Sequence, residues 1–345
     1  MSRLAEIYNA VQESHPGLAR AFLFSLLSER SNQSTILVGI AGTGKSTVMS
    51  GIKTTAKRRV YEFDALTTVG LRYVSKEGFD TNSTIIIDDL SKGGTEYRQI
   101  TTVVLIGELV FSGQVRLFTK DVQASFVNFK GSALIGAQPL MLRRIISAAE
   151  FDTDIRDKVI RYYHLYAPQK VNFDPIKVDI DVSYDYDRIG LPADVINSKD
   201  CMRAYRNFAI EFSEARAQYH FFRMLQASAM IDERKLVSEL DCRLLRQLTD
   251  NFYVEKILFD KRNLEGARRL NVNIIPVITM MSAKGYTTVD ELEQRFGVSE
   301  RRIYEILNDL QDYVYVKKKY VRPVDKIRWL VNSMKGELGG ELVIE

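Results

Sequence analysis

The sequence has 345 residues, of which 46% are hydrophobic and 27% are charged, as expected for a soluble globular protein with two or three domains. No apolar run reaches about 18 residues and the amino terminus lacks a signal-peptide pattern, so we expect a cytoplasmic protein with no membrane partner. The net charge of +4 permits nucleic acid binding without requiring it, and the two cysteines and three histidines lack metal-site spacing.

Residues 1–33 are expected to form a helical lead-in. Leu4, Ile7, Tyr8 and Val11 recur at helical spacing, and a second apolar helical segment follows Pro16-Gly17. We expect these helices to pack beside the segment that comes next.

A glycine-rich pattern, G-x-x-x-x-G-K-[ST], occupies residues 39–46. Its glycines let the backbone bend so that consecutive N–H groups surround phosphates, while Lys45 adds a positive charge. The Ser46 hydroxyl is a ligand for Mg²⁺, and the helix expected from Ser46 to Thr55 points its positive dipole end at the anion. The sequence therefore predicts binding of ATP and Mg²⁺, with contacts from Gly39, Ala41, Gly42, Thr43, Gly44, Lys45, Ser46 and Thr47.

Five buried strands separated by helices are predicted around this loop, at residues 35–38, 59–63, 84–87, 133–137 and 158–165. Alternation of strands with helices is typical of a doubly wound α/β fold, whose ligands bind where the strands end. We therefore expect an α/β ATPase core at residues 34–168, with a parallel sheet between helices.

Polar side chains directly follow two of these strands. Asp88 and Asp89 come after residues 84–87, and Gln138 comes after residues 133–137. Phosphate-loop NTPases hold Mg²⁺ and orient water with such carboxylates, so we assign Asp88 to the metal and Asp89 to the water. Gln138 would hold that water or the γ-phosphate. In the alternative interpretation, the two aspartates only cap a loop.

The segments that follow differ in character. Residues 115–118 and 124–127 are predicted as the arms of a hairpin whose turn contains Lys120. Residues 169–199 form a connecting insertion with short extended pieces and loop, whose role the sequence does not indicate. Residues 200–260 are helical, and Arg216 lies near the start of one of these helices.

Residues 261–345 predict a helix-turn-helix followed by a basic wing. Thr288 and Glu291 form a capping-box pattern, Ser299 precedes a second helix at residues 300–310, and residues 313–322 alternate as a hairpin would. Such a winged helix usually binds duplex DNA, although a protein-binding module is the alternative. The candidate DNA-binding residues are Arg301 and Arg302 in the helix and Lys317, Lys318 and Lys319 in the wing.

The order of these motifs resembles the AAA+ ATPases and, within them, the minichromosome-maintenance (MCM) helicase branch. The resemblance covers roughly residues 30–330. It rests on the phosphate loop, on Asp88-Asp89, on residues 59–61 and 67–71, and on the helix that follows Ser213, with a winged helix after it. Residues 200–260 would then be a helical lid.

The resemblance implies a homo-oligomeric ring, a hexamer, with ATP between its subunits. Arg156 would enter the neighbouring site as an arginine finger, with Arg143 and Arg144 as alternatives, and Arg216 would sense the γ-phosphate. Lys120 would contact DNA in the central channel. The implied function is a DNA helicase or translocase of DNA replication that couples ATP hydrolysis to DNA movement.

Departures from that family keep other functions open. We expect no amino-terminal oligonucleotide-binding domain, and Asp89 and Gln138 stand where glutamate and asparagine are usual. It resembles a reduced relative of the kind that mobile elements or viruses encode. The alternatives are an ATP-switched replication initiator or loader, a DNA-binding regulator with a weak or inactive ATPase core, and a packaging or transposition-accessory ATPase.

Overall fold

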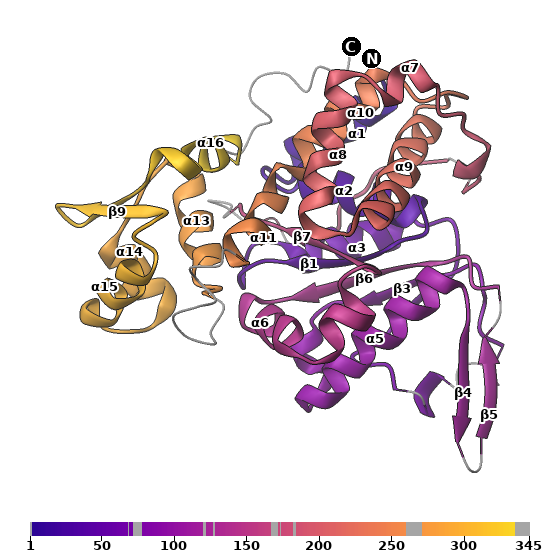
Figure 1. The fold of residues 1–345 in the computed structure, drawn as a ribbon, viewed down its shortest axis with the longest axis horizontal. Helices are drawn as coiled ribbons and strands as arrows, with labels where there is room; N and C mark the ends of the chain where they lie inside the picture. Colours follow the sequence, from indigo (N-terminus) through magenta and orange to yellow (C-terminus); the bar gives the residue numbers. More distant parts are fainter. Residues whose placement is uncertain are drawn as a thin grey trace.

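A five-stranded parallel sheet forms the centre of the computed structural model and lies between two layers of helices (Figure 1). The order β2-β3-β6-β1-β7 comprises β2 (Val60–Glu62), β3 (Thr84–Ile87), β6 (Ser132–Ala137), β1 (Ser34–Val38) and β7 (Val159–Tyr163). All five predicted strands are confirmed, with small differences at their ends. The structure describes residues 2–67, 69–71, 78–119, 122–126, 128–166, 172, 174–181, 184–259 and 271–334.

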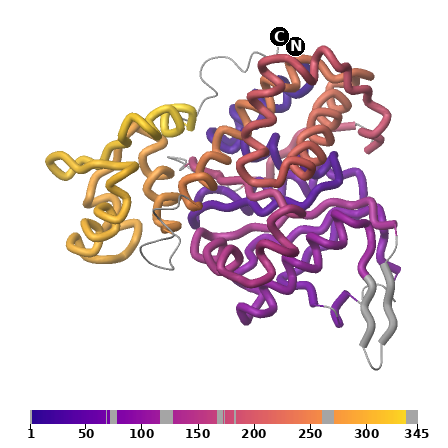
Figure 2. Tube along the Cα trace, viewed as in Figure 1, coloured from indigo at the N-terminus to yellow at the C-terminus, as the bar shows by residue number. Residues whose placement is uncertain are grey.

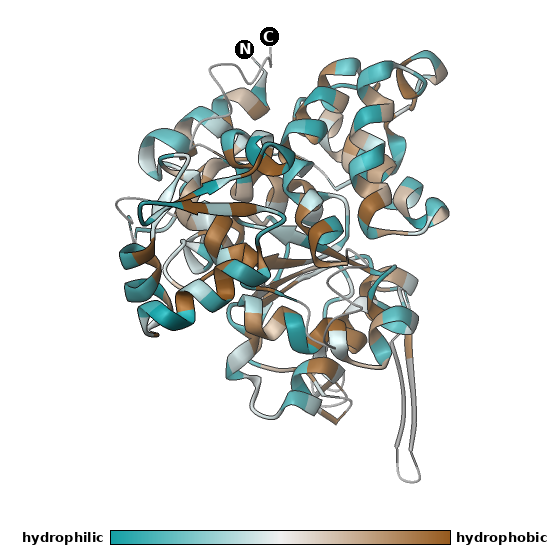
Figure 3. Ribbon diagram, turned by 60° about the vertical axis from the view of Figure 1, so that its left-hand side comes forward, coloured by the Kyte–Doolittle hydropathy of each residue, from teal (hydrophilic) through white to brown (hydrophobic). Residues whose placement is uncertain are grey.

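Helices cover both faces of this sheet, which is why its strands are apolar throughout. Ile36 and Val38 of β1 belong to the cluster with α5 (Glu96–Ser112) and α6 (Pro139–Ser147), whereas Leu37 belongs to the cluster with α2 (Ala19–Arg30) and α3 (Lys45–Thr55). The strands accordingly stand out as brown in Figure 3. Each fully buried Ile or Leu stabilises the fold by about 1.5–3 kcal/mol, so the sheet is a firm support for the loops at its edges.

The predicted lead-in forms α1 (Arg3–Ser14) and α2. The side chain of Ser2 caps α1 by accepting a hydrogen bond from the Ala5 N–H at 3.2 Å. α2 lies on the sheet beside α3, and α1 packs against α2. A Cβ built on Gly44 would lie 2.7 Å from the side chain of Leu18, at the start of α2. The lead-in therefore packs against the glycine-rich loop, as expected.

A helical region follows the sheet and lies beyond α2 and α3 (Figure 1). It contains η3 (Tyr186–Arg188), α7 (Ala193–Ile196), α8 (Lys199–Glu211), α9 (Glu214–Ile231), α10 (Glu239–Thr249), η4 (Asp250–Phe252) and α11 (Tyr253–Leu258). The buried Arg161 guanidinium of β7 ties it to the sheet by donating to both carboxylate oxygens of Glu255, at 2.9 and 3.1 Å, and to the Glu211 carbonyl at 3.0 Å. Cys201 and Cys242 are buried, with their Sγ atoms 2.6 Å apart.

Residues 271–334, orange to yellow at one side of the core in Figure 2, form a smaller unit, termed here the C-terminal module. Its elements are α13 (Ile274–Ser282), β8 (Thr287–Thr288), α14 (Val289–Phe296), α15 (Glu300–Asp309), β9 (Val314–Lys317), β10 (Tyr320–Pro323) and α16 (Asp325–Ser333), with an antiparallel sheet in the order β8-β10-β9. The capping box of Thr288 and Glu291 is confirmed. So is the basic hairpin, whose turn residues Lys318 and Lys319 have φ values of +52° and +65°.

The C-terminal module packs against the side of the core at which the sheet strands end (Figure 1). The side chain of Arg20 in α2 donates to the backbone carbonyls of Ser333 and Gln247. Tyr253 and Trp329 meet edge to face, with ring centroids 5.1 Å apart. Buried side chains also form one continuous cluster from the sheet through α11 into the module. No helix in the described part of the chain combines the length and the continuous apolar sequence needed to cross a bilayer.

Two expectations need correction in detail. β4 (Val115–Thr119) and β5 (Val122–Phe126) form the expected hairpin, but Thr119 pairs with Val122, so its strands extend closer to the tip than predicted. No strand forms in the described parts of the connecting insertion, residues 172, 174–181 and 184–199, where Gly190 makes only an isolated bridge with Leu236 and η3 and α7 already belong to the helical region. Residues 174–181 have no secondary structure. The reason is that Ile176 packs against Gly51 of α3 while its carbonyl accepts a hydrogen bond from the Thr54 hydroxyl, so this backbone joins no sheet.

Candidate functional site

One edge of the sheet collects the polar residues that follow its strands. The last residues of three adjacent strands are level, because Val38 of β1 pairs with Ala137 of β6 and with Tyr163 of β7. We term this the carboxyl edge and the opposite one the amino edge. The segments that leave the strands here are the glycine-rich loop after β1, Asp88 and Asp89 after β3, Gln138 after β6 and His164 after β7.

The glycine-rich loop, residues 39–46, passes directly into α3. Gly44 is the N-cap residue of that helix with φ of +86°, a conformation that favours glycine. The Thr43 hydroxyl donates to the Ile40 carbonyl at 2.8 Å across the loop. A Cβ built on Gly42 would meet no atom within 4 Å, so open space lies beside the loop. The free N–H groups of the first turn of α3 begin at this loop, which is the geometry that binds anions.

Lys45 is the buried cation of this loop. Its side chain is only 9% exposed, and Nζ donates to the carbonyls of Gly39 at 2.7 Å and Ile40 at 3.0 Å. Burial lowers its pKa to about 8, although the nearby Asp89 and Asp88 act in the opposite direction. An ammonium group that loses hydration without a direct carboxylate partner is stabilised by an added anion.

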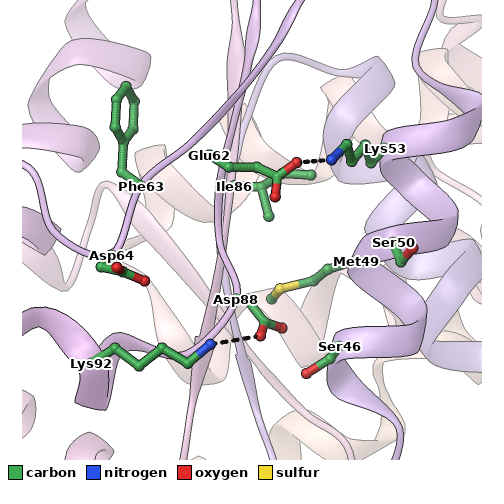
Figure 4. Close-up of a pocket in the computed structure, with 10 residues that line it drawn as sticks. All are labelled: Ser46, Met49, Ser50, Lys53, Glu62, Phe63, Asp64, Ile86, Asp88 and Lys92. Atoms are coloured by element: carbon green, nitrogen blue, oxygen red, sulfur yellow. Dashed lines mark hydrogen bonds and ion pairs between the residues drawn. The ribbon is translucent and has the colours of Figure 1, made fainter. Parts of the chain in front are cut away.

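A cavity of about 480 Å³ opens beside α3. Figure 4 shows the Ser46 hydroxyl and the Asp88 carboxylate on the same side of it. The Oδ2 atom of Asp88 accepts from Lys92 at 3.3 Å, while its buried Oδ1 atom has no hydrogen-bond partner within the described residues. The residues that line the cavity are Ser46, Met49, Ser50, Lys53, Glu62, Phe63, Asp64, Ile86, Asp88 and Lys92.

The donor set beside Asp88 fits a magnesium ion. A carboxylate oxygen and a hydroxyl are oxygen ligands of the kind that Mg²⁺ prefers, and Mg²⁺ usually keeps waters or substrate phosphates as its remaining ligands. No group of three or more His, Cys, Asp or Glu side chains that could hold a metal occurs in the described ranges. Asp88 and Ser46 would therefore hold the ion only together with phosphate oxygens and water.

The position of Asp88 depends on a glycine in the neighbouring strand. A Cβ built on Gly136 of β6 would lie 1.9 Å from the Asp88 carbonyl oxygen, so only glycine lets the chain after β3 pass this close. Asp89 is held in two ways. Its Oδ1 atom accepts from the Ser91 N–H at 2.9 Å and caps η1 (Leu90–Gly93), and its Oδ2 atom accepts from Gln138 Nε2 at 3.4 Å. Asp89 therefore caps the turn and also faces Gln138.

His164 is a site residue that the sequence interpretation missed. It is buried, and burial lowers its pKa to about 4, so the ring is neutral near pH 7. Its Nε2 atom lies 2.7 Å from the Thr43 carbonyl, which can only accept, so Nε2 carries the proton and donates to the loop. The rule that ligands bind where strands end could have indicated it, since His164 follows a predicted strand.

Arg295 is a second residue that was missed. It lies in the last turn of α14, yet its guanidinium donates to the Ala41 carbonyl of the glycine-rich loop. No local pattern could have indicated this contact, because 254 positions separate the two residues.

Arg156 and Arg216 do not line this cavity. Arg156 precedes β7 and pairs with Asp152 at 3.3 Å. Arg216 in α9 lies over the ring of Phe111, 4.2 Å from its centroid. The start of α9 is fixed to the amino edge, because the Ser213 N–H donates to the Asp157 carboxylate at 3.0 Å, just before β7. Both arginines thus lie at the edge opposite the loop.

The alternative finger residues lie elsewhere. Arg143 and Arg144 are half-buried in α6, which begins at the carboxyl edge after Gln138, and Arg144 pairs with Glu96 of α5 at 3.8 Å. Neither side chain lines the cavity beside α3.

All five candidate DNA-binding residues of the C-terminal module are exposed. Arg301 and Arg302 lie on α15 and both pair with Glu305, at 3.5 and 2.5 Å. Lys319 pairs with Asp290 at 3.3 Å and with Glu300 at 3.1 Å. Lys317 and Lys318 have no ion pair within the described ranges. Exposed aromatic side chains accompany them, namely Tyr304, Tyr315 and Tyr320. Lys120, the predicted hairpin-tip residue, lies outside the described residues.

No protein-family model matches the chain, and no curated protein matches it.

Proposed function

We propose that the chain is an AAA+-type ATPase that binds ATP and Mg²⁺ at the carboxyl edge and acts on DNA as an MCM-like helicase or translocase. The observation that carries the proposal is the buried Lys45 in a glycine-rich loop, beside the Ser46 hydroxyl and an Asp88 oxygen that has no hydrogen-bond partner among the described residues. Lys45 and the first N–H groups of α3 would bind the phosphates, and Asp88 and Ser46 would hold Mg²⁺. Bound Mg²⁺ would neutralise charge that develops on the β- and γ-phosphates.

The order of the structural units supports the AAA+ assignment. A parallel sheet with the loop after β1 and the aspartates after β3 is followed by a helical region and then by a small unit with an antiparallel hairpin. The helical region would be the lid of such an ATPase, and the C-terminal module would be its winged helix.

The glycine-rich loop and two candidate arginines lie at opposite edges of the sheet, which supports assembly into a ring. Arg156 and Arg216 lie at the amino edge, so they could reach a phosphate site only in a neighbouring copy. A head-to-tail contact of this kind is heterologous and closes into a ring when its rotation permits. Arg156 would then serve as the arginine finger, and Arg216 would contact the γ-phosphate.

Two features support DNA as the partner. The exposed basic residues of α15 and of the β9–β10 hairpin lie on one small module together with exposed tyrosines, a combination suited to phosphates and bases. The β4–β5 hairpin projects from the core (Figure 1), and Lys120, which follows Thr119 of β4 in the sequence, would grip a threaded strand.

The alternative is an ATP-switched initiator or a regulator with a weak ATPase. The position of Asp89 favours it, because one carboxylate oxygen caps η1 and the other faces Gln138. A carboxylate held in this way is poorly placed to polarise water. The alternative predicts tight ATP binding with very slow turnover.

The test of the ATP site is Lys45→Ala, with Lys199→Ala as a control that removes an exposed lysine of α8. We expect Lys45→Ala to lose ATP hydrolysis by about 100-fold or more, the effect of removing one preorganised donor to developing charge. The control should retain wild-type rates, and circular dichroism should show both folded. Undiminished hydrolysis by Lys45→Ala would refute the proposal.

The shared-site hypothesis has its own test. Arg156→Ala and Lys45→Ala proteins should each be inactive, but a mixture should regain activity, because some interfaces then combine an intact loop with an intact arginine. Hydrolysis per subunit that stays constant on dilution to a monomer would contradict shared sites. If Arg156→Ala protein is fully active and the mixture gains no activity, Arg156 is not the arginine finger. Arg143 and Arg144 would then be the candidates for that role.

A further inference from the structure

The C-terminal module places a cation on the glycine-rich loop of its own chain. The guanidinium of Arg295 donates through Nη2 to the Ala41 carbonyl. A guanidinium has five N–H donors, and within the described residues Ala41 is the only hydrogen-bond partner found for this one. Donors therefore remain for another acceptor at the same place.

The position of Arg295 is set by well-defined structure. The capping box at Thr288 fixes the start of α14, and Gly297, with φ of +63°, ends the helix two residues after Arg295. Val289 and Leu292 bury the other side of the helix in the module core. The module is in turn held by Arg20, which donates to the Ser333 carbonyl.

Two positive charges then act on one loop. Lys45 is buried and donates to loop carbonyls. Arg295 donates to another loop carbonyl, that of Ala41, and further lowers the Lys45 pKa. Like charges that share a site destabilise each other, and a polyanion bound between them removes the repulsion. Open space beside Gly42 leaves room for such an anion while Arg295 stays in contact with the loop.

We propose that Arg295 is a phosphate-binding residue, contributed by the C-terminal module to ATP in the same chain, so that ATP binding and docking of the module stabilise each other. This inference rests on the proposed ATP site. Because such coupling is reciprocal, whatever the module binds through α15 and its hairpin would also change the affinity for ATP.

The structure provides a reporter for docking. Trp329 in α16 is the only tryptophan of the chain, and it meets Tyr253 of α11 at the boundary between the module and the helical region. Its fluorescence should respond when ATP tightens that boundary.

The experiment measures ATP–Mg²⁺ affinity by calorimetry and Trp329 emission for the wild type, Arg295→Ala, Arg295→Lys and Arg328→Ala. Arg328 is an exposed arginine of α16 that pairs with Asp325 at 2.7 Å, so its replacement is a charge-matched control. We expect about tenfold weaker ATP binding for Arg295→Ala, the scale of one charge-assisted hydrogen bond at an exposed site. Arg295→Lys should lie in between, and Arg328→Ala should match the wild type. The ATP-dependent change in emission should disappear in Arg295→Ala, even at saturating ATP.

The outcomes separate this inference from the proposed function. Equal ATP affinity of the wild type and Arg295→Ala, with Lys45→Ala unable to bind, would overturn the role of Arg295 and leave the ATP site standing. Loss of affinity without any response of Trp329 in the wild type would overturn the coupling to docking. No ATP binding by the wild type would overturn both.

Discussion

The carboxyl edge of the sheet and the C-terminal module both present positive charge, but they hold it differently. Lys45 at the edge is 9% exposed, and two loop carbonyls fix its Nζ atom. The Arg301 side chain on the module is 91% exposed, and Lys317 and Lys318 also face solvent. A fixed, buried charge acts at one point, whereas exposed charges act together and are screened by salt. A single substitution at the carboxyl edge should therefore have a large effect. On the module, each substitution should have a small effect, and the effects should accumulate.

The largest effect should come from Asp88→Asn, which keeps the size of the side chain and removes the charge that would hold Mg²⁺. We expect hydrolysis to fall by about 100-fold or more, because metal stabilisation of developing charge is worth several kcal/mol. ATP should still bind through the loop. The measurement is a titration of hydrolysis against Mg²⁺, with the exposed Asp194→Asn as control. Wild-type rates of hydrolysis by Asp88→Asn would show that Asp88 only forms part of a loop. The expected severity of single substitutions at the carboxyl edge would then be wrong.

A smaller, graded effect is expected on the module. Removal of one lysine that binds a phosphate should flatten the slope of log affinity against log salt by about one unit. Lys317→Ala with Lys318→Ala should therefore lower the slope by about two, weakening duplex binding across sequences. Adding Lys319→Ala should cost less than a further unit, since Asp290 and Glu300 already neutralise Lys319. The measurement is duplex affinity from low to moderate salt. Unchanged affinity in the triple variant would favour a protein partner for the module.

The smallest effect is a pH dependence of ATP binding. Burial lowers the Lys45 pKa to about 8 in the free protein, and a bound anion favours the charged form and raises it. The complex then binds more protons than the free protein, so affinity falls as pH rises through about 8. The expected loss is about fourfold between pH 7 and pH 8.5, with proton uptake measurable by calorimetry in two buffers. Lys45→Arg should give a flat profile over this range. A flat profile in the wild type would show that Lys45 is not the titrating cation.

The sequence could predict what local patterns determine. The apolar runs indicated all five strands, and a glycine-rich loop after the first of them indicated the position of Lys45. The capping box at Thr288 and the basic hairpin are also local, and both are confirmed. Strand ends in a parallel sheet meet at one edge, so the proximity of Asp89 and Gln138 followed as well.

The rest depends on packing between distant segments. Arg295 reaches Ala41 only because the whole module docks on the core, which no spacing encodes. Arg216 was assigned to the phosphates by family resemblance, yet the Ser213 contact with Asp157 places it at the amino edge. The rule that ligands bind where strands end could have indicated His164. Its role, however, follows from burial, which the sequence alone does not give.

The contact of Arg20 with the end of α16 has a consequence for synthesis. Arg20 is half-buried, and burial lowers its pKa. One acceptor, the Gln247 carbonyl, lies 227 positions further along the chain, and the other, the Ser333 carbonyl, lies 313 positions further along. At about 5–20 residues per second, a ribosome needs roughly 15–60 s to make the intervening chain. During that interval, water or the Gln247 carbonyl must satisfy the guanidinium in place of Ser333. Docking of α16 on Arg20 can therefore occur only after the contact of Arg20 with Gln247 has become possible.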